Sequence, residues 1–356
     1  MIRVDAGALH TFIAKALTSR GVDTADARTV ADILLAADLR GVESHGAARL
    51  RSHYLNRIAN GVLDVSPVVR IERDMPTTMS IDAGNGLGHP VAKRAMQHAI
   101  DKARQRDIGI VAVRNSNHFG IAGYYAMMAL QHDMIGIAST NALRGVAPTF
   151  GSDAMLGTNP LAIAIPAASE EPYVLDFATS AVARGKLEIA VRKGGTMPLG
   201  WAVDAGGNPT TDPVAGLAGA LLPLGGSGVE NGGHKGFGLG VLVDILCAVL
   251  SGGTFGAAIP ASLGPMEPGP ISHWFMAMRV GALRDIEEFK RDVDTELRAF
   301  KASAPVPGQT RVYVPGELEF ESERDARRNG VQVRETVFAE LQAIGTELGI
   351  EPPAAR

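Results

Sequence analysis

A histidine and an arginine stand four residues apart near the start of the chain, in the stretch GVESHGAARLRSHY at residues 41–54. If this stretch is helical, His45 and Arg49 share one face, because side chains at positions i and i+4 are neighbours on a helix. A titratable base beside a permanent cation suits an alcohol substrate that also carries a carboxylate. A polar loop that leads into a surface helix fits the same pattern, and both interpretations stay open at this point.

A second histidine, His118, follows a strand-like segment in the sequence RNSNHFGIAGYY. Ligands often bind where the strands of a layered α/β protein end in glycine-rich turns. Imidazole titrates at a pH of ~6.5, so either histidine can move a proton near neutrality. Taken alone, a histidine in either place is more often structural than catalytic.

Two glycine-rich stretches resemble phosphate-binding motifs without matching them. GNGLGHP, at residues 84–90, stands between a predicted strand and a predicted helix, but its spacing is G-x-G-x-G rather than G-x-G-x-x-G, so we expect a plain turn. In GVENGGHKG, Gly236 follows Lys235 where a P-loop has a serine or threonine that binds magnesium. The glycine-flanked lysine is still able to contact a phosphate.

Metal and hydrolase chemistry find no support in the sequence. The nine histidines form no H-x-x-x-H or H-E-x-x-H motif, and the single cysteine, Cys247, lies in an apolar run and is expected to be a buried side chain. The sequence contains no G-x-S-x-G motif, which would expose a nucleophilic serine.

Composition indicates a folded protein without a nucleic-acid or membrane partner. The 356 residues have a net charge of -4, with 46% hydrophobic and 20% charged residues and no dense run of Lys and Arg. The most apolar stretch, residues 236–250, is too short to span a membrane and contains Asp244. The N-terminus lacks the apolar core of a signal peptide, and a single cysteine fits a reducing compartment, so we expect a cytoplasmic protein.

The elements that must position these residues begin with helices. Val30, Ile33, Leu34 and Ala37 form one apolar stripe, which predicts a helix that begins at Asp23 or Thr24 and stops at Gly41. A second helix is expected from about residue 44 to residue 57.

From residue 75 onward, strand-like and helix-like segments alternate, which predicts an α/β or α+β layered domain. The expected strands are TTMSIDA, GIVAVRN, MIGIAST, LAIAIP, YVLDF and HWFMAMRV, and the expected helices include VAKRAMQHAIDKARQRD, YYAMMALQ, the run from residue 236, and residues 285–301. The tail helix RETVFAELQAIGTEL has an apolar face that needs a partner, for which the N-terminal helices are the candidates.

Several separated motifs together resemble the type-2 malate/L-lactate dehydrogenase family, which also contains ureidoglycolate, sulfolactate and diketogulonate enzymes and a branch of cyclic-imine reductases. The motifs are RGVESHGAARLRSHY, NSNHFGIAGYYA, GTNPLAIAIP, LDFATSAVARGK, GWAVDAGGNPTTDP, GGHKGFGL and VPGELE. Each motif is modest alone, but their order and spacing are specific, and they extend over nearly the whole chain.

The resemblance implies an oxidoreductase that transfers a hydride between NAD or NADP and a small 2-hydroxy or 2-keto acid. It also implies a homodimer with a non-Rossmann cofactor domain built on a mixed sheet, at residues 75–330. A helical domain would form from residues 1–74 and be completed by residues 331–356. The alternative activity is NADPH-dependent reduction of a cyclic imine such as Δ1-piperideine-2-carboxylate.

Matching by position, the resemblance implies catalytic roles for Ser44, His45 and His118, either histidine being able to accept the substrate proton. Arg49 matches the arginine that binds the substrate carboxylate, and Tyr54 and Thr158 match substrate contacts. The implied cofactor contacts are His118, Phe119, Gly120, Ile121, Ala122, Asp176, Phe177, Ala178, His234, Lys235, Pro315, Gly316, Glu317 and Glu319.

Two residues depart from the family pattern. Lys186 occupies a position where the imine-reductase branch has an acidic residue that completes a Ser–His–Asp relay, which favours an alcohol dehydrogenase. Arg279 stands in HWFMAMRV where relatives often have an acidic residue, with no consequence that the sequence reveals.

Overall fold

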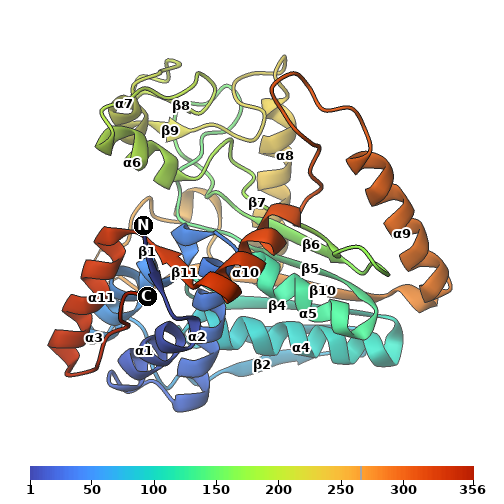
Figure 1. Ribbon diagram of the computed structural model, residues 1–356, viewed down its shortest axis with the longest axis horizontal. Helices are drawn as coiled ribbons and strands as arrows, with labels where there is room; N and C mark the ends of the chain where they lie inside the picture. Colours follow the sequence, from blue (N-terminus) through green and yellow to red (C-terminus); the bar gives the residue numbers. More distant parts are fainter. Residues whose placement is uncertain (265–266) are drawn as a thin grey trace.

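A seven-stranded sheet with the strand order β2-β3-β4-β10-β5-β6-β7 lies at the centre of the protein (Figure 1). The structure is a computed structural model that describes residues 1–264 and 267–356, apart from the side chain of Arg192. In this order the strands span Arg70–Asp74, Thr78–Asp82, Ile108–Ser116, Ile271–Arg279, Met134–Thr140, Leu161–Ile165 and Tyr173–Phe177. Of these neighbouring pairs, β3 and β4 run parallel and the others run antiparallel. The predicted mixed, non-Rossmann sheet is confirmed, because a Rossmann sheet is mostly parallel.

Helices cover both faces of this sheet. On one face, α4 (Gly88–Arg106) and α5 (Ala122–Met128) pack against side chains such as Val111, Phe275 and Ala138. On the other face, Trp274 packs with Cys247 in the π-helical turn Ile245–Val249, which extends α8 (Gly233–Asp244). Successive strand residues point to opposite faces, which explains why Trp274 and Phe275 enter different cores.

The two ends of the chain fold together into one helical unit. β1 (Ile2–Val4) pairs antiparallel with β11 (Val331–Val333), and the two termini lie side by side in Figure 1. α1 (Ala6–Thr18), α2 (Thr24–Leu39) and the tail helix α11 (Glu335–Leu348) share one core. The tail helix therefore buries its apolar face against the N-terminal helices.

The division into a helical and an α/β domain stays a prediction, and two details of the arrangement bear on it. β2 falls within the range 1–74 expected to be helical, yet it pairs with β3 in the central sheet. A smaller unit above the sheet in Figure 1 contains α6 (Arg184–Arg192), β8 (Ala202–Val203), α7 (Pro213–Ala218) and β9 (Ala220–Leu221). These elements surround a separate small core that includes Leu187 and Met197.

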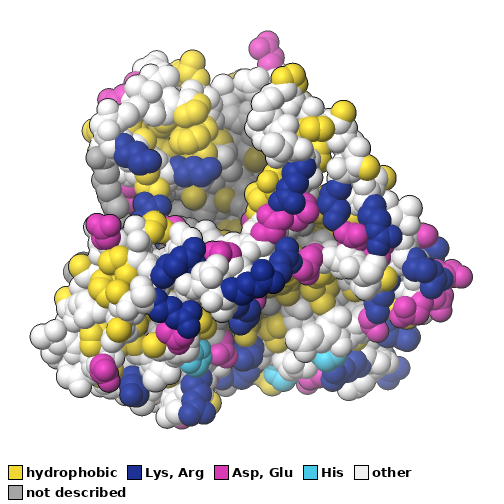
Figure 2. Space-filling view, viewed as in Figure 1, with side chains coloured by type: hydrophobic (Ala, Val, Ile, Leu, Met, Phe, Trp, Pro, Cys, Tyr) yellow, Lys and Arg dark blue, Asp and Glu magenta, His cyan; other side chains and the backbone are white. Residues whose placement is uncertain are grey.

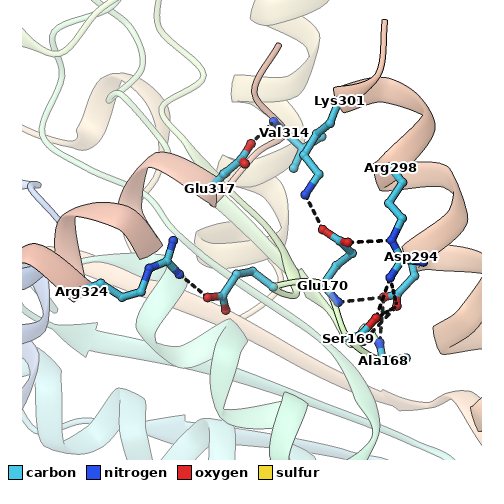
Figure 3. A network of polar contacts seen from close by, with 10 residues as sticks. Ala168, Ser169, Glu170, Asp294, Arg298, Lys301, Val314, Glu317 and Arg324 are labelled. Carbon is cyan, nitrogen blue, oxygen red and sulfur yellow. Dashed lines mark hydrogen bonds and ion pairs between the residues drawn. The ribbon is translucent and has the colours of Figure 1, made fainter. Parts of the chain in front are cut away.

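Helix α9 (Ile286–Lys301) is fixed to the β6–β7 turn by a polar network rather than by a large core (Figure 3). The buried carboxylate of Asp294 accepts the backbone N–H groups of Ala168, Ser169 and Glu170 at 2.9, 2.9 and 3.2 Å, and the Ser169 hydroxyl at 2.6 Å. Burial alone raises the pKa of Asp294, but these hydrogen bonds outweigh burial and lower it to about 2. Asp294 therefore stays ionised and anchors the helix.

The segment after α9 returns across the sheet to α10 (Glu317–Asn329), over which Lys, Arg, Asp and Glu side chains alternate on the face shown in Figure 2. Ion pairs such as Arg324–Glu171 and Arg327–Glu323 belong to this mixed surface. Within residues 1–264 and 267–356, no helix combines the length and apolar character needed to cross a membrane.

Candidate active site

The segment that follows α2 is not the single helix expected at residues 44–57. It consists of short 3-10 turns at Glu43–His45 and Ala47–Arg49, a π-helical stretch at Leu50–Leu55, and one α-helical turn, α3, at Asn56–Ala59. A π-helix adds a residue to each turn and frequently marks a functional site. His45 and Arg49 therefore do not lie on one regular helix face, although the chain still brings them close together.

The break in the helix has a cause at Gly46 and Asp38. The buried carboxylate of Asp38 accepts the backbone N–H of Ala47 at 2.8 Å. A Cβ atom on Gly46 would lie 1.9 Å from Asp38 Oδ1, so only glycine allows this approach. Burial raises the pKa of Asp38 to about 7, against the effect of the Ala47 N–H. Asp38 thus holds the loop that carries His45.

His118 lies at the centre of a group of aromatic and imidazole rings. Its ring stacks on His45 with centroids 5.4 Å apart, and it meets the edge of His53 at 5.3 Å. The Tyr54 hydroxyl lies 2.5 Å from His118 Nδ1 and 3.3 Å from His89 Nε2. The structure therefore brings together His45, His118 and Tyr54, and it adds two histidines that the sequence did not single out.

Hydrogen-bond geometry assigns the proton positions in this group. The backbone N–H of Gly120 points at His118 Nδ1 at 3.4 Å, and an N–H group can only donate, so Nδ1 is an acceptor. Tyr54 then donates to His118 Nδ1 and accepts from His89 Nε2, which leaves the hydrogen of the neutral His118 ring on Nε2. The Nδ1 atom of His89 is buried without a hydrogen-bond partner among the described residues, as expected for its unprotonated nitrogen.

The histidines of this group are neutral at pH 7. Burial, and then the charge of Arg49, lower the pKa of His45 to about 4. Burial likewise lowers the pKa of His89 to about 3 and that of His118 well below its ordinary value. Arg49 donates from Nε to the Ser44 carbonyl at 2.5 Å, and Ser44 Oγ lies 2.9 Å from His45 Nδ1. A neutral imidazole beside a cation is a group that can accept a proton.

A cavity of about 290 Å³ opens next to this group, between the helical unit and the sheet. Many of the residues implicated by the sequence line it: Ser44, His45, Gly120, Ile121, Ala122, Thr158, Asp176, Phe177, Ala178, Pro315, Gly316 and Glu319. Asp176, on β7, accepts the Gly123 N–H at 2.7 Å, and burial raises its pKa to about 6.

The lining of the cavity fits a dinucleotide cofactor. A Cβ atom on Gly123 would lie 2.8 Å from Asp176 Oδ2, and one on Gly120 would lie 2.6 Å from Ile33, so the backbone packs this closely against its neighbours only because these residues are glycines. Backbone N–H groups suit phosphate oxygens, and the carboxylates of Asp176 and Glu319 suit ribose hydroxyls. Small lining residues such as Ala178 and Ala183 leave room for a flat ring.

Other residues implicated by the sequence lie elsewhere. Phe119 is buried in the core, stacked on His273 with centroids 4.6 Å apart. His234 and Lys235 are exposed on the first turn of α8, and neither lines the cavity. Residues 315–319 are only partly a loop, because Gly316, at φ +94°, is the N-cap of α10, which begins at Glu317. Glu317 accordingly turns its carboxylate to the Val314 N–H at 3.2 Å.

Three residues of the site were missed by sequence reasoning. His89 belongs to GNGLGHP, which the sequence predicted to be a plain turn. That turn brings His89 Nε2 to 3.3 Å from the Tyr54 hydroxyl. His53 follows Ser52 as His45 follows Ser44, a repetition that was visible in the sequence. Arg40 lines the cavity, where it lies over the Phe320 ring at 4.5 Å and pairs with Glu323 at 3.3 Å.

The two departures from the family pattern also have structural partners. Lys186 Nζ lies 5.8 Å above the centre of the Trp201 ring within the small upper unit. Arg279, the last residue of β10, donates from Nε to the Asp107 carboxylate at 2.7 Å, so its charge forms an ion pair at the end of this strand.

Fold and site together define a dehydrogenase of non-Rossmann type, and the comparisons with known proteins agree. The family model for malate/L-lactate dehydrogenase matches residues 4–342. A malate dehydrogenase of Pyrococcus horikoshii is 44% identical over 98% of this chain and 96% of its own length. An L-sulfolactate dehydrogenase of Methanocaldococcus jannaschii is 39% identical over 93% of this chain and 92% of its own length. The crystal structure of malate dehydrogenase from Entamoeba histolytica superposes with a TM-score of 0.93 at 37% identity, covering 99% of both chains.

The chain belongs to the malate/L-lactate dehydrogenase family and is an NAD(P)-dependent hydroxy-acid dehydrogenase. Relatives that are 32% identical carry NAD⁺ or NADP⁺ in their names, so the cofactor is NAD or NADP. A Δ1-piperideine-2-carboxylate reductase of Pseudomonas syringae superposes less well, with a TM-score of 0.82 at 27% identity over 97% of this chain and all of that one.

Proposed function

We propose that the substrate is a small 2-hydroxy acid whose carboxylate binds Arg49 and whose hydroxyl proton passes to His118 or His45. The observation that carries this proposal is the stacked pair of neutral imidazoles, 5.4 Å apart, with Arg49 close enough to lower the pKa of both. The guanidinium offers a planar fork that binds a carboxylate through two parallel hydrogen bonds.

The Tyr54 hydroxyl allows His118 to work in both directions. In the arrangement described above, His118 carries its hydrogen on Nε2 and can donate it to a keto oxygen. A tyrosine hydroxyl both donates and accepts, so the direction of the bonds from His89 through Tyr54 to His118 can reverse. Reversal moves the hydrogen of His118 to Nδ1, which breaks the long 3.4 Å contact with the Gly120 N–H, and moves that of His89 to its own Nδ1. Nε2 of His118 is then free to accept the proton of an alcohol.

The residues that line the cavity would hold the nicotinamide cofactor, which supplies or accepts the hydride when bound. The backbone of Gly120–Gly123 and the carboxylates of Asp176 and Glu319 would contact it. His234 and Lys235, implicated by resemblance, stay part of the proposal only as a contact outside this cavity.

The proposal includes a homodimer. Leu242, Ile245, Val249 and Leu250 on α8 and its extension are each 47–60% exposed, and together they form an apolar strip that a second copy would cover. Light scattering of the purified protein at micromolar concentration tests this part, and a monomer would contradict it. Cys247 is buried and free, in keeping with the cytoplasmic location that we also propose.

The alternative function is reduction of a cyclic imine. In the structure Lys186 lies against Trp201, so a positive charge stands where the imine-reductase branch has an acidic residue, and this favours the hydroxy acid.

A substrate panel tests the proposal directly. L-malate, L-lactate and the corresponding keto acids are compared with Δ1-piperideine-2-carboxylate and a pyrroline analogue, each with both coenzymes, by NAD(P)H absorbance. We expect turnover of hydroxy acids, and turnover confined to the imines would contradict the proposal. Arg49→Leu should raise KM for carboxylate substrates far more than it changes coenzyme binding.

A further inference from the structure

His273, on β10, is a fully buried imidazole that the proposed proton transfer does not use. In the sheet it lies between Val113 of β4 and Thr140 of β5. Its ring reaches the ends of both neighbouring strands, because Nδ1 lies 2.8 Å from Thr140 Oγ1 and Nε2 lies 2.8 Å from Ser116 Oγ. The ring therefore joins β5 to the strand end that leads into His118.

The directions of these hydrogen bonds follow from the acceptors around Thr140. Its hydroxyl lies 2.9 Å from the backbone carbonyls of Asn141 and Ser272, and a carbonyl can only accept. Thr140 therefore donates to a carbonyl and accepts from Nδ1 of His273. Burial lowers the pKa of His273 to about 3, so the ring is neutral and its Nε2 accepts the Ser116 hydroxyl. The orientation of Ser116 is thus set from β5, through His273.

His273 also holds the chain on the other side of His118. Its ring stacks on Phe119, with the planes 6° apart and the centroids separated by 4.6 Å. Phe119 is itself fixed, since its carbonyl accepts the Tyr125 hydroxyl and its ring stacks on the Tyr125 ring. One side chain therefore contacts both the residue two before His118 and the residue directly after it.

The strand end needs such support because its backbone is irregular. β10 pairs Ile271 with Ser116 and His273 with Val113, so two steps along β10 correspond to three along β4. The extra residue makes a β-bulge, which bends a strand and re-aims the side chains beyond it. Asn115 has φ +54°, a left-handed conformation that is uncommon for residues other than glycine and persists where neighbouring contacts enforce it. The path of the chain beyond the bulge therefore depends on those contacts.

We propose that His273 is a positioning residue for the reaction, which holds the His118 imidazole in place through Ser116 and Phe119. The position of His118 is then set by three paired strands rather than by its own loop alone. This role rests on the proposed function, because it requires His118 to exchange the proton. A displacement of about 1 Å at the reacting atoms can slow a reaction by about 100-fold, so loss of this support should lower kcat more than it raises KM.

Two serine variants separate positioning from stability. Ser116 and Ser139 are both completely buried, but Ser139 lies opposite Trp274 on the other face of the sheet, where its hydroxyl is 3.3 Å from Cys247 Sγ. Ser116→Ala should lower kcat for L-malate oxidation about 10-fold, with KM changed by less than about threefold. Ser139→Ala also loses a buried hydroxyl, so urea should unfold both variants at a lower concentration, but its kcat should stay within about threefold of the wild type.

Two substitutions of His273 supply a second comparison. The amide of glutamine stands in for Nε2 and can accept from Ser116, whereas the shorter asparagine stands in for Nδ1 and reaches only Thr140. Both variants lose the stacking on Phe119. His273→Asn should lower kcat by about 10- to 100-fold, and His273→Gln should keep a kcat about 10-fold above that of His273→Asn.

A measurement on His118 itself distinguishes positioning from general damage. The nitrogen NMR signals of its ring, recorded with isotopically labelled histidine and assigned by their loss in His118→Ala, report the tautomer that the Tyr54 hydrogen bond sets. These signals should shift in Ser116→Ala and match the wild type in Ser139→Ala.

Three results would each overturn the role of His273: the same kcat in the two serine variants, the same kcat in the two His273 variants, or an unchanged His118 spectrum in Ser116→Ala. Failure of the wild type to oxidise any hydroxy acid with either coenzyme would instead overturn the proposed function. The NMR comparison would still decide whether His273 positions His118.

Discussion

The hydroxyl of Tyr54 lies 2.5 Å from Nδ1 of His118 and 3.3 Å from Nε2 of His89, so one buried oxygen joins the two imidazoles. Three elements far apart in the sequence supply these groups: the π-helical stretch, the end of β4 and the start of α4. This hydrogen-bonded group lies where the helical unit meets the sheet, so the orientation of the His118 ring depends on the helical unit and on the sheet.

Tyr54→Phe should slow the chemical step in both directions, by about 10- to 100-fold, because His118 loses the partner that sets its tautomer. The N–H of His89 Nε2 is left without an acceptor and His118 Nδ1 keeps only the long contact with the Gly120 N–H, which should lower stability by about 1–3 kcal/mol. Single-turnover rates and urea unfolding measure the two effects. Tyr125→Phe is the control, since Tyr125 is also fully buried and its hydroxyl binds the Phe119 carbonyl, so stability should fall without the loss of rate.

His45→Ala and His118→Ala should each lower the rate of hydride transfer by about 10²–10⁴-fold if both imidazoles take part in proton transfer. Circular dichroism checks that each variant keeps its fold. Turnover close to that of the wild type in one variant would remove that histidine from the mechanism and assign the proton to the other.

The kcat/KM of alcohol oxidation should decrease only at a pH well below that at which an ordinary histidine titrates. The base must be unprotonated, and burial followed by the charge of Arg49 lowers the pKa of His45 to about 4, so kcat/KM should hold from pH 7 down to about 4 and fall below it. Arg49→Leu removes one cause of the shift and should move this decrease to higher pH. A decrease near pH 6.5 in the wild type would show that the base is not a buried histidine.

Stability should fall as the pH drops below 6.5, because unfolding exposes buried neutral histidines that then bind protons. Burial lowers the pKa of His273 to about 3, so between pH 6.5 and 3 the unfolded state binds more protons than the folded state. Each such histidine contributes a slope of up to about 1.4 kcal/mol per pH unit. His273→Gln should be less stable at pH 8, since the bonds to Thr140 and Ser116 are altered, but it should show a shallower slope in urea unfolding between pH 7 and 4. An unchanged slope would contradict this account.

Asp294→Asn should loosen α9 and, through it, the segment that leads to Pro315 and Gly316 in the cavity. The neutral amide oxygen is a weaker acceptor for the backbone N–H groups of the β6–β7 turn, and Arg298 keeps Glu170 but loses its second carboxylate partner, so we expect a loss of about 2–3 kcal/mol and weaker coenzyme binding. Asp292→Asn is the matched control on the same helix, as Asp292 is exposed and pairs only with Arg284 among the described residues. Equal effects of the two changes would show that the network does not fix the segment.

Local patterns predicted the regular elements well. The stripe from Val30 to Ala37 gave the helix that spans Thr24–Leu39, with Asp23 as its N-cap and Gly41, at φ +75°, just beyond its end. Six of the seven strands of the central sheet were visible as β-rich runs, and only β2 was missed. Their order was not visible, because β10 enters the sheet between β4 and β5 from more than a hundred residues away, and no local pattern records such a pairing.

The site itself was predicted in part. Ser44, His45 and Thr158 line the cavity, but the irregular path of residues 43–59 depends on the contact of Asp38 with Gly46 across the end of α2, which helical periodicity does not reveal. His89 and Arg40 were passed over because each looked ordinary in its own segment. Their importance arises only from what the fold places beside them.

The pairing of β1 with β11 has a consequence for synthesis on the ribosome. Helices α1 and α2, whose end carries the loop with His45, share their core with α11, and Arg356 donates its backbone N–H to Arg3 at 2.8 Å. A nascent chain therefore exposes the apolar stripes of its first two helices until the whole central sheet has been translated. The loop that carries His45 therefore gains its supporting core last, although it is encoded among the first fifty residues.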